Sequence, residues 1–168
     1  MIRLLTALML FFTLFASAHA GEDASQQNVS ITISPFHLLN PELHLTGELR
    51  LTSKISVAGM GGAGKITDEG KKSGIWELGG QFRYYFLGSF THGMMLGADA
   101  GYVDVNAQIE NPTEYLVGAH AGGFLGYKFS MKNGFTVEVQ IGPVYVWGES
   151  AETSELETLL HFNVGWSF

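Results

Sequence analysis

Apolar and polar residues alternate along most of this chain with a period of two, most clearly between Leu43 and Leu51. Leucines occupy one face of this segment, and the other face carries His44, Thr46, Glu48 and Arg50. Successive side chains of a β-strand point to opposite sides of the sheet, whereas a helix would distribute these charges around its axis. The pattern therefore predicts a strand with one apolar and one polar face.

The same alternation recurs along the chain. It is clear in residues 29–34, 76–86, 135–141 and 160–168, and three runs rich in glycine follow it more weakly: 55–64, 94–105 and 115–129. Together these segments predict eight strands and an all-β fold. No Lys-Ser or Lys-Thr pair follows the glycines where a phosphate loop needs one, so we assign them to sharp curvature of the sheet.

The predicted connections differ in length in a regular way. Short connections (52–54, 89–93 and 131–134) alternate with longer, charged ones (65–73, 106–112 and 148–155). This asymmetry is typical of bacterial outer-membrane barrels, whose periplasmic turns are short. With eight strands both termini fall on the short-turn side, although the first connection, 36–41, is shorter than this pattern predicts. Pro143 lies inside the seventh strand, where we expect a bulge or an early end to regular pairing.

The N-terminus has the three parts of a secretory signal peptide. Arg3 is followed by an apolar run from Leu4 to Phe15 and by Ala18-His19-Ala20. The small residues Ala18 and Ala20 predict cleavage before Gly21. The alternative is a transmembrane anchor, which we disfavour because the apolar run is shorter than the ~20 residues of a membrane-spanning helix. Residues 21–27 are polar, and we expect a short disordered periplasmic lead-in there.

Composition narrows the class of partner. The chain has 9 Lys and Arg residues against 16 Asp and Glu residues, so losing Arg3 with the signal peptide leaves a net charge of −8. This balance argues against nucleic acid as a partner. The chain contains no Cys, so an exported form has no disulfides, and a closed strand ladder in lipid is another source of stability.

The C-terminal strand carries a family resemblance. The chain ends in Phe168, and apolar residues precede it at every second position: Leu160, Phe162, Val164 and Trp166. Together with the signal peptide, this strand resembles the C-terminal assembly signal of small eight-stranded bacterial outer-membrane β-barrels. The resemblance implies that residues 28–168 form a closed antiparallel up-and-down transmembrane barrel. It also implies insertion by the barrel assembly machinery, with outer-membrane lipid and lipopolysaccharide as surroundings, and it brings no active site.

A lipid-facing surface should be apolar with aromatic rims. Aromatic residues at the predicted long-loop rim are Trp76, Tyr102, Tyr115, Tyr145 and Trp147. Those at the periplasmic rim are Tyr84, Phe86, Tyr127, Phe129, Trp166 and Phe168. The alternative is a soluble lipocalin-like barrel, which would place such rings inside and the charges outside.

The polar face predicts a charged interior. It should hold four acids and three bases: Glu48, Glu77, Asp99, Glu138, Arg50, Arg83 and Lys128. An eight-stranded barrel is barely wide enough for its own side chains, and unpaired buried ions are costly. We therefore expect these groups to pair as an ionic plug, and the alternative is a polar path for protons or small ions.

A group of histidines and an acidic segment could each bind a metal ion or could simply be hydrated polar residues. His44, His120 and His161 should point inward near Glu77, which is the donor chemistry of a zinc site, but their spacing does not require one. The acidic segment 148–158 is a candidate for divalent cations that bridge to lipopolysaccharide. We favour histidines in a hydrated interior and a solvated charge run, with no metal or cofactor.

Three functions are consistent with the sequence. The first is a non-enzymatic barrel with a structural or surface-interaction role. The second is an enzyme acting on lipid A or phospholipid, which would need a nucleophile beside a rim histidine; His120 is followed by Ala121 and Gly122. The third is a narrow channel. We favour the first and expect no catalytic residues.

Overall fold

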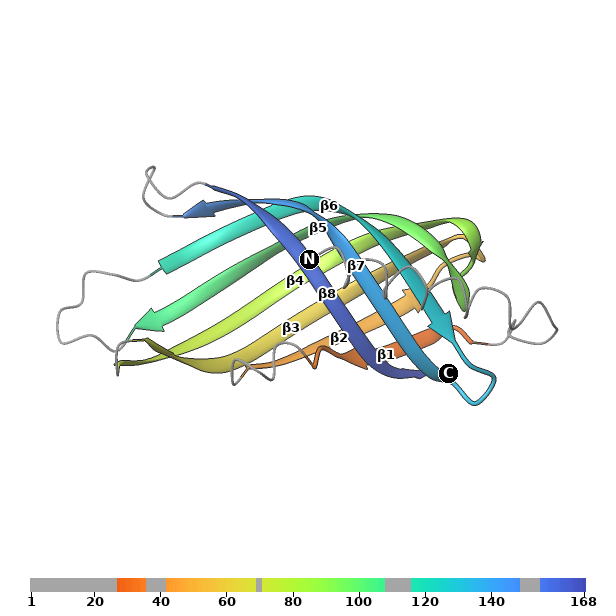
Figure 1. Cartoon of the computed structure of the whole chain (residues 1–168), viewed down its shortest axis with the longest axis horizontal. Helices are drawn as coiled ribbons and strands as arrows, with labels where there is room; N and C mark the ends of the chain where they lie inside the picture. Colours follow the sequence, from red (N-terminus) through yellow and green to blue (C-terminus); the bar gives the residue numbers. More distant parts are fainter. Residues whose placement is uncertain (1–26, 36–41, 69–70, 108–115, 149–154) are drawn as a thin grey trace, which may run out of the picture.

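The computed structural model describes residues 27–35, 42–68, 71–107, 116–148 and 155–168, and these form eight strands. The strands are β1 (Val29–Ile33), β2 (Glu42–Arg50), β3 (Ile55–Asp68), β4 (Lys71–Ser89), β5 (His92–Ala107), β6 (Leu116–Ser130), β7 (Phe135–Gly148) and β8 (Glu155–Ser167). Each pairs with its neighbour in sequence, and β1 pairs with β8 (Figure 1). This confirms the predicted all-β fold, a closed antiparallel barrel of eight strands.

The ladders close with a large stagger. Following paired residues around the barrel from Ser167 on β8, through Ser30 on β1 and Glu48 on β2, leads back to β8 at Glu157, ten residues from the start. With ~3.3 Å per residue and ~4.8 Å between strands, this stagger tilts the strands by about 40° to the barrel axis. An eight-stranded barrel of this kind has a narrow interior that side chains can fill.

Short turns and both ends of the described barrel lie together at one end. Asn28 N–H donates to the Phe168 carbonyl at 2.6 Å, and the Gln27 side chain donates to the Met131 carbonyl in the β6–β7 turn. That turn contains Gly134 at φ 89°, a left-handed conformation that glycine adopts without strain. We call this end of the barrel the short-turn end and the opposite end the long-loop end.

Three local expectations were wrong. Pro143 causes no bulge and does not end the strand: β7 pairs with β8 across Pro143, and the β6–β7 pairing is only interrupted at Gly142 and Pro143, with the same register on either side. The register shift instead lies between Tyr85 and Leu87 on β4. Residues 65–68 and 71–73 belong to strands, because β3 and β4 continue to pair as far as Asp68 and Lys71. The strand β8 begins at Glu155, inside the predicted acidic loop.

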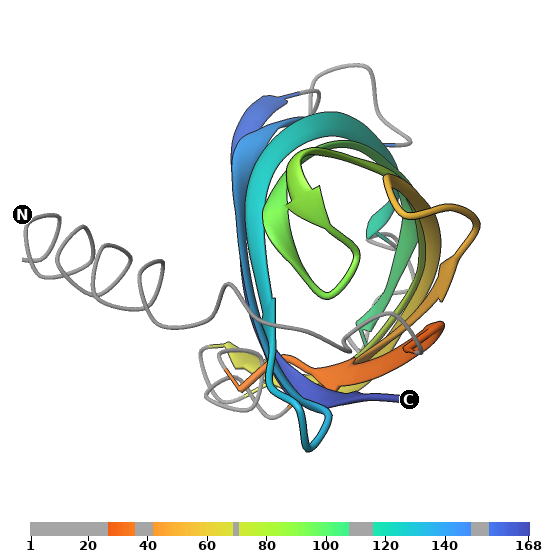
Figure 2. The same cartoon turned by 90° about the vertical axis from the view of Figure 1, so that its right-hand side faces the viewer.

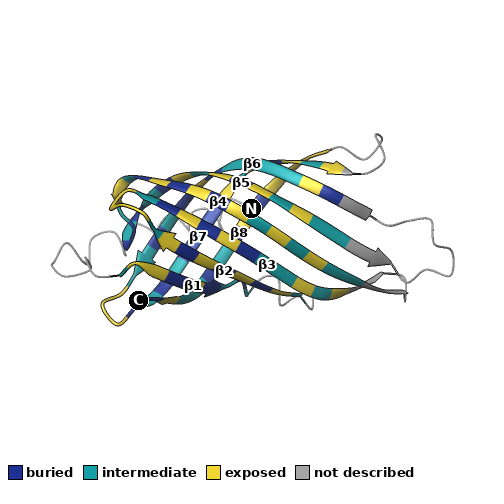
Figure 3. Cartoon of the chain, turned by 180° about the vertical axis from the view of Figure 1, so that it is seen from behind, coloured by how far each residue is buried: buried dark blue, intermediate teal, exposed yellow. Residues whose placement is uncertain are grey.

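Burial follows the alternation along the strands, with polar groups inside. Among the described residues, eighteen polar or charged side chains are buried against eight apolar ones, and twenty-three large hydrophobic side chains are exposed. Figure 3 shows buried and exposed positions alternating along each strand. The barrel therefore has a polar interior and an apolar outer surface. No helix in the described part of the chain is long and apolar enough to span a membrane.

Candidate functional site in the barrel interior

Charged side chains from three strands meet in the short-turn half of the interior. Glu48 on β2 accepts from Lys128 Nζ at 2.6 Å, and Arg83 Nη1 lies 2.9 Å from its carboxylate. The Tyr85 hydroxyl and the Ser56 hydroxyl also donate to Glu48, at 2.7 and 2.5 Å. All five side chains are buried, so Glu48 offsets two buried cations at once.

The network continues from Arg83 toward β7 and β8. Arg83 Nη1 donates to Glu138 at 2.8 Å, and the amides of Gln140 and Asn163 donate to the same carboxylate at 2.6 and 3.1 Å. Gln81 accepts two bonds from Arg83, at 2.9 and 2.6 Å. Each of the four buried ions therefore contacts at least one ion of opposite charge, which is the condition under which buried charges are tolerated.

The β4–β5 turn closes this end of the interior. Phe90 is fully buried, its ring lies edge-on to Tyr85, and Lys128 Nζ is 3.7 Å from its centre. Figure 2 shows this turn lying across the opening at the short-turn end. We call Glu48, Arg83, Tyr85, Phe90, Lys128 and Glu138 the plug.

Three of the seven predicted interior charges lie outside the plug. Arg50 lies near the short-turn end, where its guanidinium donates to the backbone carbonyls of Gln27 and Thr52. Asp99 accepts from Gln81 at 2.8 Å and faces His120. Glu77 lies farther along the barrel, among the histidines.

Two of the three histidines lie near Glu77, and the third, His161, packs against His44. His120 Nε2 lies 2.9 Å from Asp99 and 4.0 Å from Glu77, and His44 Nε2 lies 3.8 Å from Glu77. The rings of His44 and His161 are 5.5 Å apart. Within the part of the chain that the structure describes, no group of three or more His, Asp or Glu side chains has the arrangement of a metal site.

Glycines make room for these imidazoles. A Cβ at Gly101 would collide with the His120 ring, and a Cβ at Gly62 would press on Glu42 and His44. The strands β3 and β5 thus carry no side chain where the rings lie. The missing side chains of these two glycines leave the space that the His44 and His120 rings occupy.

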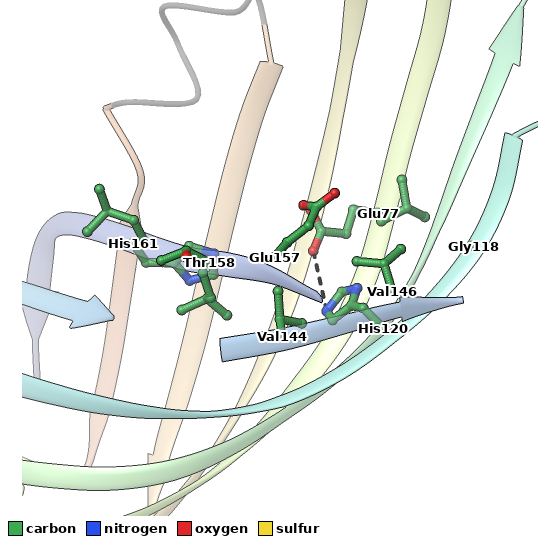
Figure 4. A pocket seen from close by; sticks show the side chains of 11 residues that line it. Glu77, Gly118, His120, Val144, Val146, Glu157, Thr158 and His161 are labelled. Atoms are coloured by element: carbon green, nitrogen blue, oxygen red, sulfur yellow. Dashed lines mark ion pairs between the residues drawn. The ribbon is translucent and has the colours of Figure 1, made fainter. Parts of the chain in front are cut away.

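A cavity of about 390 Å³ occupies the interior beside His120 (Figure 4). Its polar lining comes from Glu77, His120, Glu157, Thr158 and His161. Its apolar lining comes from Val103, Val144, Val146, Leu159 and Leu160. In Figure 4, Glu77 points toward His120, and the two valines of β7 flank the histidine. The long-loop half of the interior is therefore hollow, whereas the short-turn half is filled.

The proposed assembly strand and most predicted rim aromatics lie on the outer surface. On β8, Leu160, Trp166 and Phe168 are exposed, and Phe162 and Val164 are half-buried. Rim residues pair by contact: Trp76 with Tyr102 and Tyr145 with Trp147 toward the long-loop end, and Phe135 with Trp166 near the short turns. The signal peptide (1–20), nearly all of the lead-in (21–27), Tyr115 and residues 149–154 of the acidic loop lie outside the described residues.

The sequence prediction missed two members of the plug, Tyr85 and Phe90, and three amide side chains that are bonded to it. Gln81, Tyr85, Gln140 and Asn163 share the inward face with the charges, and their position in the alternation was the available signal. Phe90 lies in a turn, where alternation gives no face, so nothing in the sequence marked it.

Comparison of the chain with protein-family models, curated proteins and solved structures found no match.

Proposed function

We propose that this protein is a non-enzymatic, integral outer-membrane β-barrel with a structural or surface-interaction role, whose interior is plugged by a polar and ionic network. The observation that carries this proposal is the inverted distribution of polarity. In water, a barrel with an ionic interior and an apolar outer surface would expose large contiguous apolar area at great cost. In a bilayer the same distribution is favourable, because every backbone polar group is paired within the closed ladder.

The length of the apolar surface supports this assignment. An outer-membrane barrel presents an apolar band ~25 Å tall, which strands tilted by about 40° cross in roughly ten residues at ~3.3 Å each. The outward positions of β7 from Phe135 to Trp147 and of β8 from Leu156 to Phe168 carry no charge. Both stretches are long enough to cross such a band.

The few outward charges support the same orientation. Among the described strand side chains, the outward Lys and acidic residues are Lys65 and Asp104, both toward the long-loop end. Asp104 pairs across the ladder with Trp76, so it lies at the level of the aromatic rim. A charge at this level is tolerated, whereas one at the bilayer midplane is not.

The plug favours a structural or surface role over conduction. Lys128 and Arg83 are both bonded to Glu48 across the buried interior, and Phe90 covers the short-turn end. An ion would have to break these contacts to pass. The signal peptide predicted at residues 1–20 and the terminal Phe168 support export and barrel assembly as the route to this location.

The first test is fractionation of cells that express the full chain. We expect the protein in the outer-membrane fraction, with an unboiled gel band that migrates differently from the boiled one because a closed barrel resists unfolding by detergent. A single unshifted band in the soluble periplasmic fraction would contradict the proposal.

A substitution on the outer surface gives a sharper test. Ile141 is 52% exposed in the middle of β7, so Ile141→Arg in a soluble barrel would change stability by less than ~0.5 kcal/mol. At the midplane of a bilayer the same change should cost about 2–4 kcal/mol, measured by urea unfolding in lipid vesicles. Met131→Arg, in an exposed turn, is the matched control. Equal and negligible effects of both substitutions would point to a soluble protein.

A further inference from the structure

The cavity in the long-loop half of the barrel is left unexplained by a structural role. A plugged barrel needs no hollow beside its plug, yet about 390 Å³ remains open next to His120. This volume lies at the lower end of the range of small-molecule sites, ~300–1,000 Å³. The cavity is partly accessible, since the Glu77 and His120 side chains are 14% and 11% exposed while Arg83 and Lys128 are nearly fully buried.

The lining of the cavity has two different sides. Val144, Val146 and Leu159 form an apolar wall from β7 and β8, which Val103 of β5 extends. Glu77 and Glu157 contribute two carboxylates, and no Lys or Arg is among the described residues that line the cavity. These carboxylates give the lining two negative charges beside an apolar surface.

The polar side of this cavity is held in place. His120 is fixed by its 2.9 Å contact with Asp99, which in turn accepts from Gln81 at the border of the plug. The missing side chain at Gly101 leaves room for the His120 ring. Glu77 lies between His120 and His44, at 4.0 and 3.8 Å. A ligand would thus meet a preformed set of acceptors, and preorganisation lowers the cost of binding.

We propose that this cavity binds a small amphiphilic cation, an apolar body that carries one protonated amine, with the amine facing Glu77 and the body against Val144, Val146 and Leu159. An ammonium group donates three hydrogen bonds and is favoured by neighbouring carboxylates. An anion would meet two carboxylates and no cationic side chain of Lys or Arg. The inference goes beyond the proposed role and depends on it only for the direction in which the cavity opens.

The experiment uses the purified barrel in phosphatidylcholine nanodiscs, titrated by calorimetry with three indoles of similar size. Tryptamine carries a positive charge, tryptophol is neutral, and indole-3-acetate is negative. We expect tryptamine to bind about tenfold more tightly than tryptophol, and indole-3-acetate not to bind measurably. Titration into empty nanodiscs corrects for partitioning into lipid.

Two variants locate the site. Glu77→Gln should reduce tryptamine affinity to that of tryptophol, and Val146→Trp should abolish binding of both by filling the cavity. Glu155→Gln, which removes a carboxylate from the same end of β8 without touching the cavity lining, is the control and should bind as the unchanged protein does.

The outcomes separate this inference from the proposed function. Equal affinity for all three indoles, or tryptamine binding that survives Glu77→Gln and Val146→Trp, would overturn the cavity as a cation site. Heat-dependent gel migration of the same samples reports whether the barrel is intact. A folded outer-membrane barrel that binds no indole therefore refutes the ligand and leaves the location standing.

Discussion

The two halves of the barrel interior are built on one backbone pattern and reach opposite solutions. At the short-turn end, long side chains fill the cross-section: Arg83, Lys128, Tyr85 and Phe90 are buried and in contact. At the long-loop end the inward positions hold glycines and valines, and a cavity remains. Alternation fixes which face is polar, whereas side-chain volume decides whether the interior is closed or hollow.

The charges also differ between the halves. In the plug, Glu48 and Glu138 share Arg83 at 2.9 and 2.8 Å, and Lys128 completes the set. Around the cavity, Glu77 faces histidines at 3.8 and 4.0 Å and is partly exposed. Water can replace a lost partner at the open end, but it cannot do so in the plug. Equivalent substitutions should therefore cost much more at one end than at the other.

The largest effect is expected for Glu48→Gln. The change removes the charge that offsets Arg83 and Lys128 and leaves buried cations short of a partner, which costs about 3–5 kcal/mol. Urea unfolding in lipid vesicles, followed by tryptophan fluorescence and by gel migration, measures it. A loss below 1 kcal/mol would show that the plug is not a dry ionic cluster.

Phe90→Ala should destabilise the barrel by about 3 kcal/mol, because truncating a buried phenylalanine loses its packing and leaves a void. Phe90 is fully buried against Tyr85 and Lys128 although it lies in a turn. The same unfolding assay applies, with Met131→Ala in the exposed β6–β7 turn as the control. If the two alanine variants unfold alike, the β4–β5 turn does not close the barrel.

A glycine pair tests packing at the border of the halves. The Phe124 ring lies where a Cβ at Gly97 would stand, whereas a Cβ at Gly59 would meet nothing within 4 Å. Gly97→Ala should therefore cost about 1–3 kcal/mol through displaced packing, and Gly59→Ala less than ~0.5 kcal/mol. Comparable unfolding midpoints for both variants would mean that Phe124 moves aside freely.

The fold could be predicted because each strand carries its own signal. The segment from Leu43 to Leu51 identifies its two faces without reference to any other segment. That Glu48 points inward follows from the barrel's apolar outer surface, because a soluble barrel would turn the charged face outward. Predictions from local sequence were wrong where pairing with a neighbouring strand determines the structure. The register is kept at Pro143 because β8 pairs across it, and residues 65–68 and 71–73 are strand because β3 and β4 continue to pair.

The partners within the interior could not be predicted from the alternation. Glu48 and Lys128 are 80 residues apart and on strands that are not neighbours, so their contact depends on the stagger accumulated around the whole barrel. An error of two residues in one register would move Lys128 by two positions along the axis. Which of the seven predicted charges join the plug therefore depends on the closed barrel and cannot be read from any one strand.

The smallest effect is expected for Glu77→Gln, and it tests the comparison directly. Its carboxylate is partly exposed and its histidine contacts are long, so water from the cavity should take the place of the lost charge. We expect a change below ~1 kcal/mol in the urea assay, as for a surface ion pair. Because the change is chemically identical to Glu48→Gln, the difference between the two variants measures how far hydration differs along one interior. Equal losses would mean that the long-loop half is as dry as the plug, and the cavity would then be closed to a ligand.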